Sequence, residues 1–119
     1  MSAWVYVAGI VACGVGAAAR YALGLARREG SFPWPTVAAN VVGSAVLGAA
    51  AGAVATGAPE WVLVVGGAGL AGGLSTFSSL ALDAVTLWGT ARRWGAVAYL
   101  GATFALGIGA AWLGWLVTS

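Results

Sequence analysis

Four apolar runs, each about as long as a membrane crossing, make up most of this 119-residue sequence. A transmembrane helix requires roughly 20 mainly apolar residues, and the runs cover about residues 3–26, 36–55, 61–88 and 94–117. Because 61% of the residues are hydrophobic and only 7% are charged, a soluble domain of this length would lack a polar surface. We therefore predict an all-α integral membrane protein, with residues 1–119 forming a single domain of four transmembrane helices.

The residue types that catalytic sites require are scarce. The sequence contains no histidine, so a Ser-His-Asp triad, a Cys-His pair and a histidine metal site are all excluded. The net charge of +2 includes five basic residues, all of them arginines near the ends of the apolar runs. Basic residues at such positions bear on membrane topology and not on nucleic acid. We expect neither an enzyme nor a nucleic-acid-binding protein.

The arginines are confined to one side of the predicted fold. Four crossings place both termini on one side of the membrane and the first and third loops on the other. Those two loops hold four arginines: Arg27, Arg28, Arg92 and Arg93. The termini and the middle loop contain no lysine or arginine. Since positive loops stay in the cytoplasm, we predict that loops one and three are cytoplasmic, that both termini lie outside, and that the chain inserts in one orientation.

The third apolar run carries its own helix breaker. Residues 66–83 read GGAGLAGGLSTFSSLALD, with glycines, serines and a threonine at the centre. Glycine is a poor helix former, and Ser and Thr offer the backbone alternative hydrogen bonds, so we predict that the third helix is broken at its centre. Carbonyls freed within a membrane must be buried, face water or bind an ion. The segment is therefore either an ion site or a glycine-rich packing face.

Several polar side chains within the runs have two interpretations. Arg20 is either a snorkelling side chain near the interface or part of a cationic vestibule that attracts anions. Asn40 either links helices or lines a polar path. Tyr99 and Thr103 are spaced i,i+4 and place two hydroxyls on one helical face, although a tyrosine near the interface is ordinarily a belt residue. The GxxxG pair formed by Gly48 and Gly52 favours close helix packing.

The deep polar groups include no carboxylate. Asp83 is the only acidic residue within a run, and it lies near the predicted cytoplasmic end, where Arg20 could pair with it. Cation and proton-coupled transporters normally need carboxylates at depth, whereas hydroxyls, an amide and backbone N–H groups can donate to an anion. Four helices cannot enclose a polar path and shield it from lipid, so we expect an oligomer.

Three motifs follow one another along the chain. The first run contributes Gly16, Ala17, Arg20 and Tyr21, and the second contributes Asn40, Gly43, Ser44 and Gly48. The third carries the most specific signature: Gly72, Gly73, Ser75, Thr76, Phe77 and Ser78, followed by Asp83. In order and spacing these motifs resemble those of the small Fluc (CrcB) fluoride channels, and the resemblance covers nearly the whole chain.

The resemblance implies a passive channel that exports fluoride across the plasma (inner) membrane and lowers cytoplasmic fluoride toxicity. Two subunits would associate antiparallel and form two pores, with a structural Na⁺ at the dimer centre. By motif, main-chain oxygens of Gly72 and Ser75 would bind that ion, as hard cations take oxygen ligands. Arg20 would lie in a vestibule. The implied fluoride pathway comprises Asn40, Phe77, Thr76, Ser78, Tyr99 and Thr103.

Three departures from the family pattern matter. Ala12 and Cys13 stand where a Gly-Gly pair is common, and Leu80 stands where the signature usually has a second phenylalanine. Leucine lacks the quadrupole with which an aromatic edge attracts an anion. Past Thr103, the next position on the hydroxyl face is Gly107, which thins the polar track. Together with the one-sided arginines, these departures suggest a heterodimer with a homologous partner of opposite topology.

Two other classes of membrane protein remain as alternatives. The chain would be a non-conducting partner subunit if the altered signature had lost its role in permeation. Small multidrug transporters also have four helices, but they need a carboxylate deep in the first crossing, and residues 3–26 contain none. That second alternative is disfavoured.

Overall fold

The structure is a computed structural model that describes residues 1–28 and 30–119. Its elements are α1 (Ala3–Gly24), α2 (Trp34–Ala55), the π-helical η1 (Leu63–Ala71), α3 (Gly72–Leu74), α4 (Ser78–Gly89) and α5 (Arg93–Thr118). Four stretches are long and apolar enough to cross a membrane: Ala3–Gly24, Trp34–Ala55, Leu63–Gly89 and Arg93–Thr118. The described residues form no strand. The predicted all-α class, with four crossings and a broken third helix, is confirmed.

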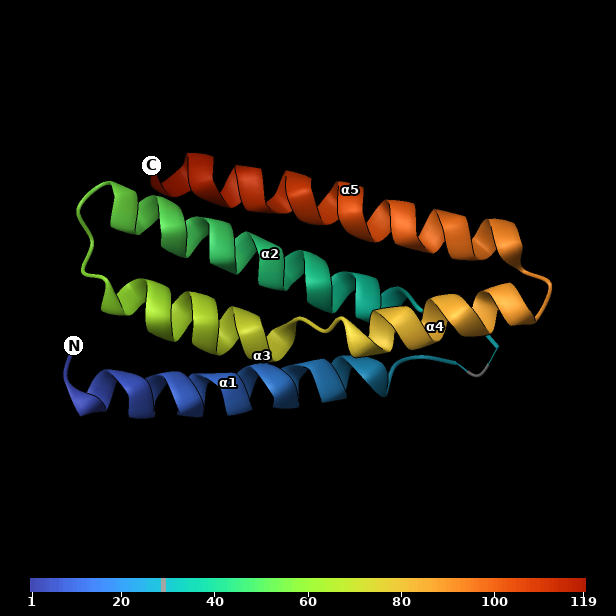
Figure 1. Ribbon diagram of the computed structural model, residues 1–119, viewed down its shortest axis with the longest axis horizontal. Helices are drawn as coiled ribbons and strands as arrows, with labels where there is room; N and C mark the ends of the chain where they lie inside the picture. The colour runs from blue at the N-terminus through green and yellow to red at the C-terminus, as the bar shows by residue number, and fades with distance from the viewer. Residues whose placement is uncertain (29) are drawn as a thin grey trace.

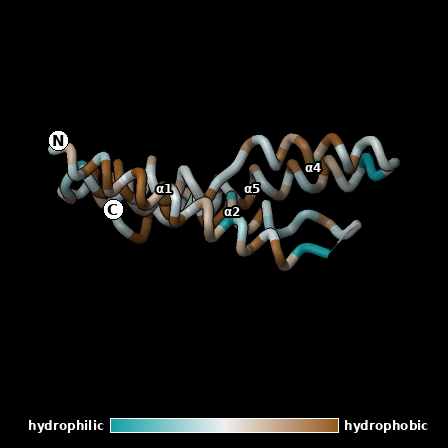
Figure 2. Tube along the Cα trace, turned by 90° about the horizontal axis from the view of Figure 1, so that it is seen from below, coloured by the Kyte–Doolittle hydropathy of each residue, from teal (hydrophilic) through white to brown (hydrophobic). Residues whose placement is uncertain are grey.

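The helix ends and loops are arranged as expected for a chain that crosses the membrane four times (Figure 1). Both termini and the loop between α2 and η1 lie at one end of the molecule, and the first and third loops lie at the other. In Figure 2, hydrophilic colour marks the tips of the end that carries these two loops, whereas the helices are mostly pale to brown. Helix α2 begins at Trp34, two residues earlier than predicted, because Pro35 fits the first turn of a helix.

The third crossing changes its neighbours at the break. Its first half, η1 and α3, packs against α1, whereas its second half, α4, packs against α5. Helix α2 lies between them and makes its largest contact with α5. A continuous helix would run straight along one partner, so the interruption lets a single crossing join the two outer helices.

Glycines allow the helices to approach backbone to backbone. A Cβ on Gly48 would collide with the carbonyl of Ala111, and one on Gly52 would lie 2.8 Å from the carbonyl oxygen of Trp115. The close packing predicted for this glycine pair is therefore confirmed, and α5 is its partner. Gly73 meets the backbone of Cys13 in the same way, so the small residues of the third crossing also serve packing.

Large apolar side chains cover the outer surface, as suits a protein whose surroundings are lipid or a partner subunit. Trp4, Ile10, Trp94, Ile108 and Val117 are all exposed. The main buried cluster is small and lies near the end with the first and third loops; it consists of Leu80, Leu87, Ala96 and Tyr99. Helices α4 and α5 are held together there.

Candidate functional site

The break in the third crossing spans residues 75–77. Helix α3 ends at Leu74, and Ser75 adopts an extended conformation with φ −80° and ψ 156° before α4 begins at Ser78. The hydroxyl of Ser75 donates back to the carbonyl of Ala71, which also accepts the backbone N–H of Ser75 at 2.9 Å. A Cβ on Gly43 would lie 2.8 Å from the Ser75 hydroxyl oxygen, so a glycine on α2 leaves room for this turn.

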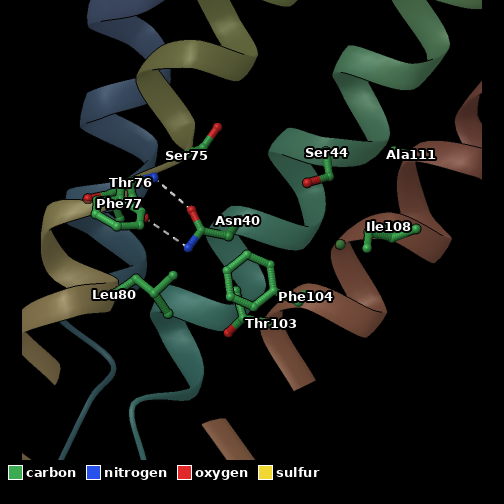
Figure 3. Close-up of a pocket in the computed structure, with 11 residues that line it drawn as sticks. Asn40, Ser44, Ser75, Thr76, Phe77, Leu80, Thr103, Phe104, Ile108 and Ala111 are labelled. Carbon is green, nitrogen blue, oxygen red and sulfur yellow. Dashed lines mark hydrogen bonds between the residues drawn. The ribbon is translucent and has the colours of Figure 1, made fainter. Parts of the chain in front are cut away.

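Asn40 of α2 binds both backbone groups of one buried residue in the break (Figure 3). Its Nδ2 donates to the carbonyl of Thr76 at 3.0 Å, and its Oδ1 accepts the N–H of Thr76 at 2.6 Å. Asn40 is only 8% exposed. A buried backbone group without a partner is costly, and this one amide satisfies both groups of Thr76.

Two carbonyls in the break thereby lose the donors that a continuous helix would give them. In an α-helix the N–H of Thr76 would donate to Gly72, and the N–H of Ser79 would donate to Ser75. Instead, Thr76 N–H donates to Asn40, and Ser79 N–H donates to the Oγ1 of Thr76 at 3.2 Å. The second bond resembles a helix N-cap at the start of α4. The main-chain oxygens of Gly72 and Ser75 therefore lack the donors that a continuous helix would give them.

A pocket of about 400 Å³ lies between the break, α2 and α5. Four residues of the expected fluoride pathway line it: Asn40, Thr76, Phe77 and Thr103. Phe77 is 77% exposed, whereas Thr103 is 6% exposed. The Thr103 Oγ1 is buried and makes no hydrogen bond to any residue that the structure describes. The pocket is therefore lined by a residue whose hydroxyl has no partner among the described residues and by the break that Asn40 binds.

Sequence reasoning missed part of this pocket. Phe104 and Ile108 also line it. Ser44, of the second motif, lines it too, as do Leu80 and Gly107, two of the positions at which the sequence departs from the family pattern. A Cβ on Gly107 would lie 3.3 Å from the hydroxyl oxygen of Ser44, so the hydroxyl of Ser44 lies beside the gap that Gly107 leaves. The sequence signal for Phe104 as a pocket residue was its position next to Thr103. That signal is weak, because consecutive residues of a helix lie on different faces.

A second pocket, of about 550 Å³, lies toward the end with the first and third loops. Arg20 and Tyr21 of α1, Thr36 of α2, and Ser78 and Ser79 of α4 are among its lining residues. Thr76 lines both pockets. The structure thus places Arg20 with Ser78, apart from the pocket of Asn40 and Thr103, and the break separates the two hollows.

Tyr99 lies outside both pockets. It is 0% exposed, its hydroxyl donates to Asp83 at 3.2 Å, and Phe32 packs edge-on against its ring with centroids 5.6 Å apart. The expected hydroxyl pair of Tyr99 and Thr103 is therefore divided between two environments. Helix α4 covers Tyr99 through Leu80 and Leu87. Thr103 lies one turn further along α5, at the level of the break that precedes α4.

Asp83 pairs with a different arginine from the one expected. Arg27 Nη1 lies 3.0 Å from the Asp83 carboxylate, which also accepts a hydrogen bond from the hydroxyl of Thr36 at 3.2 Å. The expected pairing with Arg20 is therefore wrong, and Arg20 faces the second pocket instead. Arg27, at the tip of the first loop, reaches across to α4 because the chain turns there over the end of the bundle.

The described residues contain no cluster of His, Cys, Asp or Glu side chains that could hold a metal ion. Any cation would have to bind through other oxygens. Main-chain carbonyls are suitable ligands for hard cations, which is the chemistry that the sequence resemblance implies for Gly72 and Ser75.

Comparison with known proteins places the chain in a family. Residues 6–115 match the family model described as CrcB-like protein, Camphor Resistance (CrcB). A protein of Renibacterium salmoninarum named fluoride-specific ion channel FluC is 41% identical over 85 residues, which is 70% of this chain and 67% of that protein. FluC 1 of Streptomyces coelicolor is 40% identical over 84% of this chain and 68% of its own length.

A relative of similar length gives the same result. Fluoride-specific ion channel FluC 1 of Geobacillus kaustophilus is 39% identical over 105 residues, covering 86% of this chain and 87% of that protein. The matched region includes nearly all of the four crossings, and the family model spans the helix break and the pocket beside it. The chain belongs to the CrcB family.

Proposed function

We propose that this chain is a subunit of a fluoride channel that exports fluoride passively and lowers its cytoplasmic toxicity. Relatives that carry the name fluoride-specific ion channel support the ion and the transport class. The observation that carries the proposal is the buried, unpartnered Oγ1 of Thr103, a residue that lines the pocket beside Asn40. A hydroxyl held in an apolar wall without a partner is costly, and a permeating anion would accept its hydrogen bond.

The chemistry of the pocket suits an anion that must leave again. Among the residues that the structure describes, its lining contains hydroxyls, an amide and aromatic rings but no charged side chain. A fixed positive charge would trap fluoride, whereas neutral donors and the positive edge of Phe77 attract it more weakly. Arg20, in the adjacent pocket with Ser78, would raise the local anion concentration without standing in the narrow path.

An antiparallel partner would complete the pathway. Phe77 is exposed at the mouth of the pocket, so one wall is open in the single chain. We assign that wall to a homologous subunit of opposite topology. In this assembly loops one and three, with their arginines, are cytoplasmic, and both termini lie outside the plasma (inner) membrane. Arg27 and Arg92 are at the loop end, where Arg92 donates to the Gly30 carbonyl at 2.7 Å.

A structural Na⁺ at the dimer centre is the proposed role for the open carbonyls. Gly72 and Ser75 of one chain supply two oxygens, fewer than a hard cation ordinarily takes, so equivalent oxygens of the partner would complete the set. The ion would hold the two broken helices together and would satisfy backbone groups that the break leaves without helical donors.

Substitutions in the assembled complex test the proposed function. Asn40→Asp removes the amide donor to Thr76 and places a carboxylate in the pocket, and Phe77→Ile removes the ring. Both are expected to reduce fluoride efflux, measured with a fluoride electrode on vesicles or cells that contain the chain with its native partner. Unchanged efflux in both variants would show that the chain is a non-conducting partner subunit, the alternative that Leu80 favours.

The lone chain gives a separate test of the partner. When purified alone and reconstituted into liposomes, it is expected to conduct little fluoride, because its one-sided arginines prevent antiparallel self-association. Full fluoride efflux from such liposomes would contradict the heterodimer and leave the channel function intact.

A further inference from the structure

One wall of the Asn40 pocket lacks an aromatic side chain. Leu80 of α4 lines the pocket but is only 4% exposed, and it packs in the cluster of Leu87, Ala96 and Tyr99. Its aliphatic side chain offers no positive edge to an anion. An ion that had lost part of its water shell there would meet only hydrocarbon on this side, which raises its energy.

A different helix brings a ring to the same pocket. Phe104 of α5 lines it together with Phe77, Leu80 and Thr103. Figure 3 draws the Phe104 ring between Asn40 and the label of Thr103. Phe104 thus lines the same pocket as Thr103 and as Asn40, whose amide binds the break. Phe104 is one of only three phenylalanines in the chain, and two of the three line this pocket.

We infer that Phe104 supplies the aromatic contact to the permeating anion that Leu80 does not. This inference rests on the proposed channel function. Phe104 and Thr103 are consecutive residues of α5, and both line the pocket that Phe77 also lines. The subunit then keeps two aromatic contacts along its pocket, although one of them comes from the fourth crossing and not from the third. Phe104 is accordingly a residue of the fluoride pathway in this chain.

The substitutions are made in the chromosomal gene of the source organism, so that each variant chain assembles with its native partner. The loss of fluoride efflux in Phe77→Ile measures the share of efflux that passes through this pocket. Phe104→Leu is expected to reduce that share roughly fivefold, which corresponds to the loss of an aromatic contact of about 1 kcal/mol. Phe104→Tyr, which keeps the ring edge, is expected to retain most of it. Trp112→Leu removes an exposed ring from the same helix outside the pocket and should leave efflux unchanged.

The outcomes separate this inference from the proposed function. If Asn40→Asp and Phe77→Ile lower efflux while Phe104→Leu does not, the role of Phe104 is wrong and the channel function stands. Equal losses in Phe104→Leu and Phe104→Tyr, with normal protein levels in the membrane, would also overturn it, because the ring edge would not be the determinant. If Asn40→Asp, Phe77→Ile and Phe104→Leu all leave efflux unchanged, the proposed function fails and this inference fails with it.

Discussion

Asn40 shows how one side chain can set both the shape and the chemistry of a membrane site. By binding the N–H and the carbonyl of Thr76, it removes the need for a continuous helix at that point. The hydroxyl of Thr76 then accepts the N–H of Ser79, and the two bonds together leave the oxygens of Gly72 and Ser75 without their helical donors. The polar residues of the break act as a connected network, so their effects on transport and on stability should be coupled.

Tyr99→Phe separates the structural hydroxyl from the pathway hydroxyl on α5. The variant loses the hydrogen bond to Asp83 but no group that lines the pocket. We expect unchanged fluoride efflux and a free energy of unfolding lower by about 1 kcal/mol, measured by denaturant titration in detergent micelles. The Asp83 carboxylate keeps Arg27 and Thr36 as partners. A loss of efflux with normal stability would place Tyr99 in the pathway after all.

At the scale of elements, the sequence predicted the helices and the break but not every contact between them. Apolar length and the Gly-Ser-Thr cluster are local signals, so four crossings and an interrupted third helix followed directly. Which arginine meets Asp83 depends on how the first loop folds over the bundle, and spacing along one helix does not contain that information. For the same reason Tyr99 and Thr103, although on one face, meet different neighbours: α4 in one case and the break in the other.

Glycine substitutions test the packing between α2 and α5. Gly48→Ala would drive a methyl group into the Ala111 carbonyl, which is backbone and cannot move aside. We expect a loss of about 1–3 kcal/mol in the free energy of unfolding. Gly101→Ala on α5 is the matched control, because a Cβ there has no neighbour within 4 Å and replaces a poor helix former. Equal stability of the two variants in the same denaturant titration would contradict the packing described for Gly48.

At the scale of the whole molecule, three features of the single chain support the proposed partner subunit. Its outer surface exposes many large apolar side chains, its pocket is open beside Phe77, and its break offers two carbonyl oxygens to a ligand that needs more. The proposed partner of opposite orientation would account for all three, because it would cover apolar surface, close the pocket and double the oxygen set. In that assembly the arginine distribution would determine which orientation this chain contributes.

Sodium removal tests this view of the assembly. Because an ion that binds only the dimer stabilises it by mass action, replacing sodium with a large organic cation should shift the complex toward separate subunits. Size-exclusion chromatography in detergent at several protein concentrations measures the shift, and restoring sodium should reverse it. A dimer that is equally stable with and without sodium would exclude Gly72 and Ser75 as ligands of a structural Na⁺, while leaving the pathway residues untouched.

Fluoride efflux from vesicles that hold the assembled protein with Thr103→Val tests the pathway most directly. Valine keeps the shape of threonine and removes only the buried hydroxyl, which has no partner among the described residues, so the fold should lose little or no stability. If that hydroxyl donates to permeating fluoride, efflux should fall by about tenfold or more, as expected for a lost hydrogen bond to a charged group, and Thr103→Ser should retain most of it. Undiminished efflux through the valine variant would contradict the assignment of this pocket as the fluoride path.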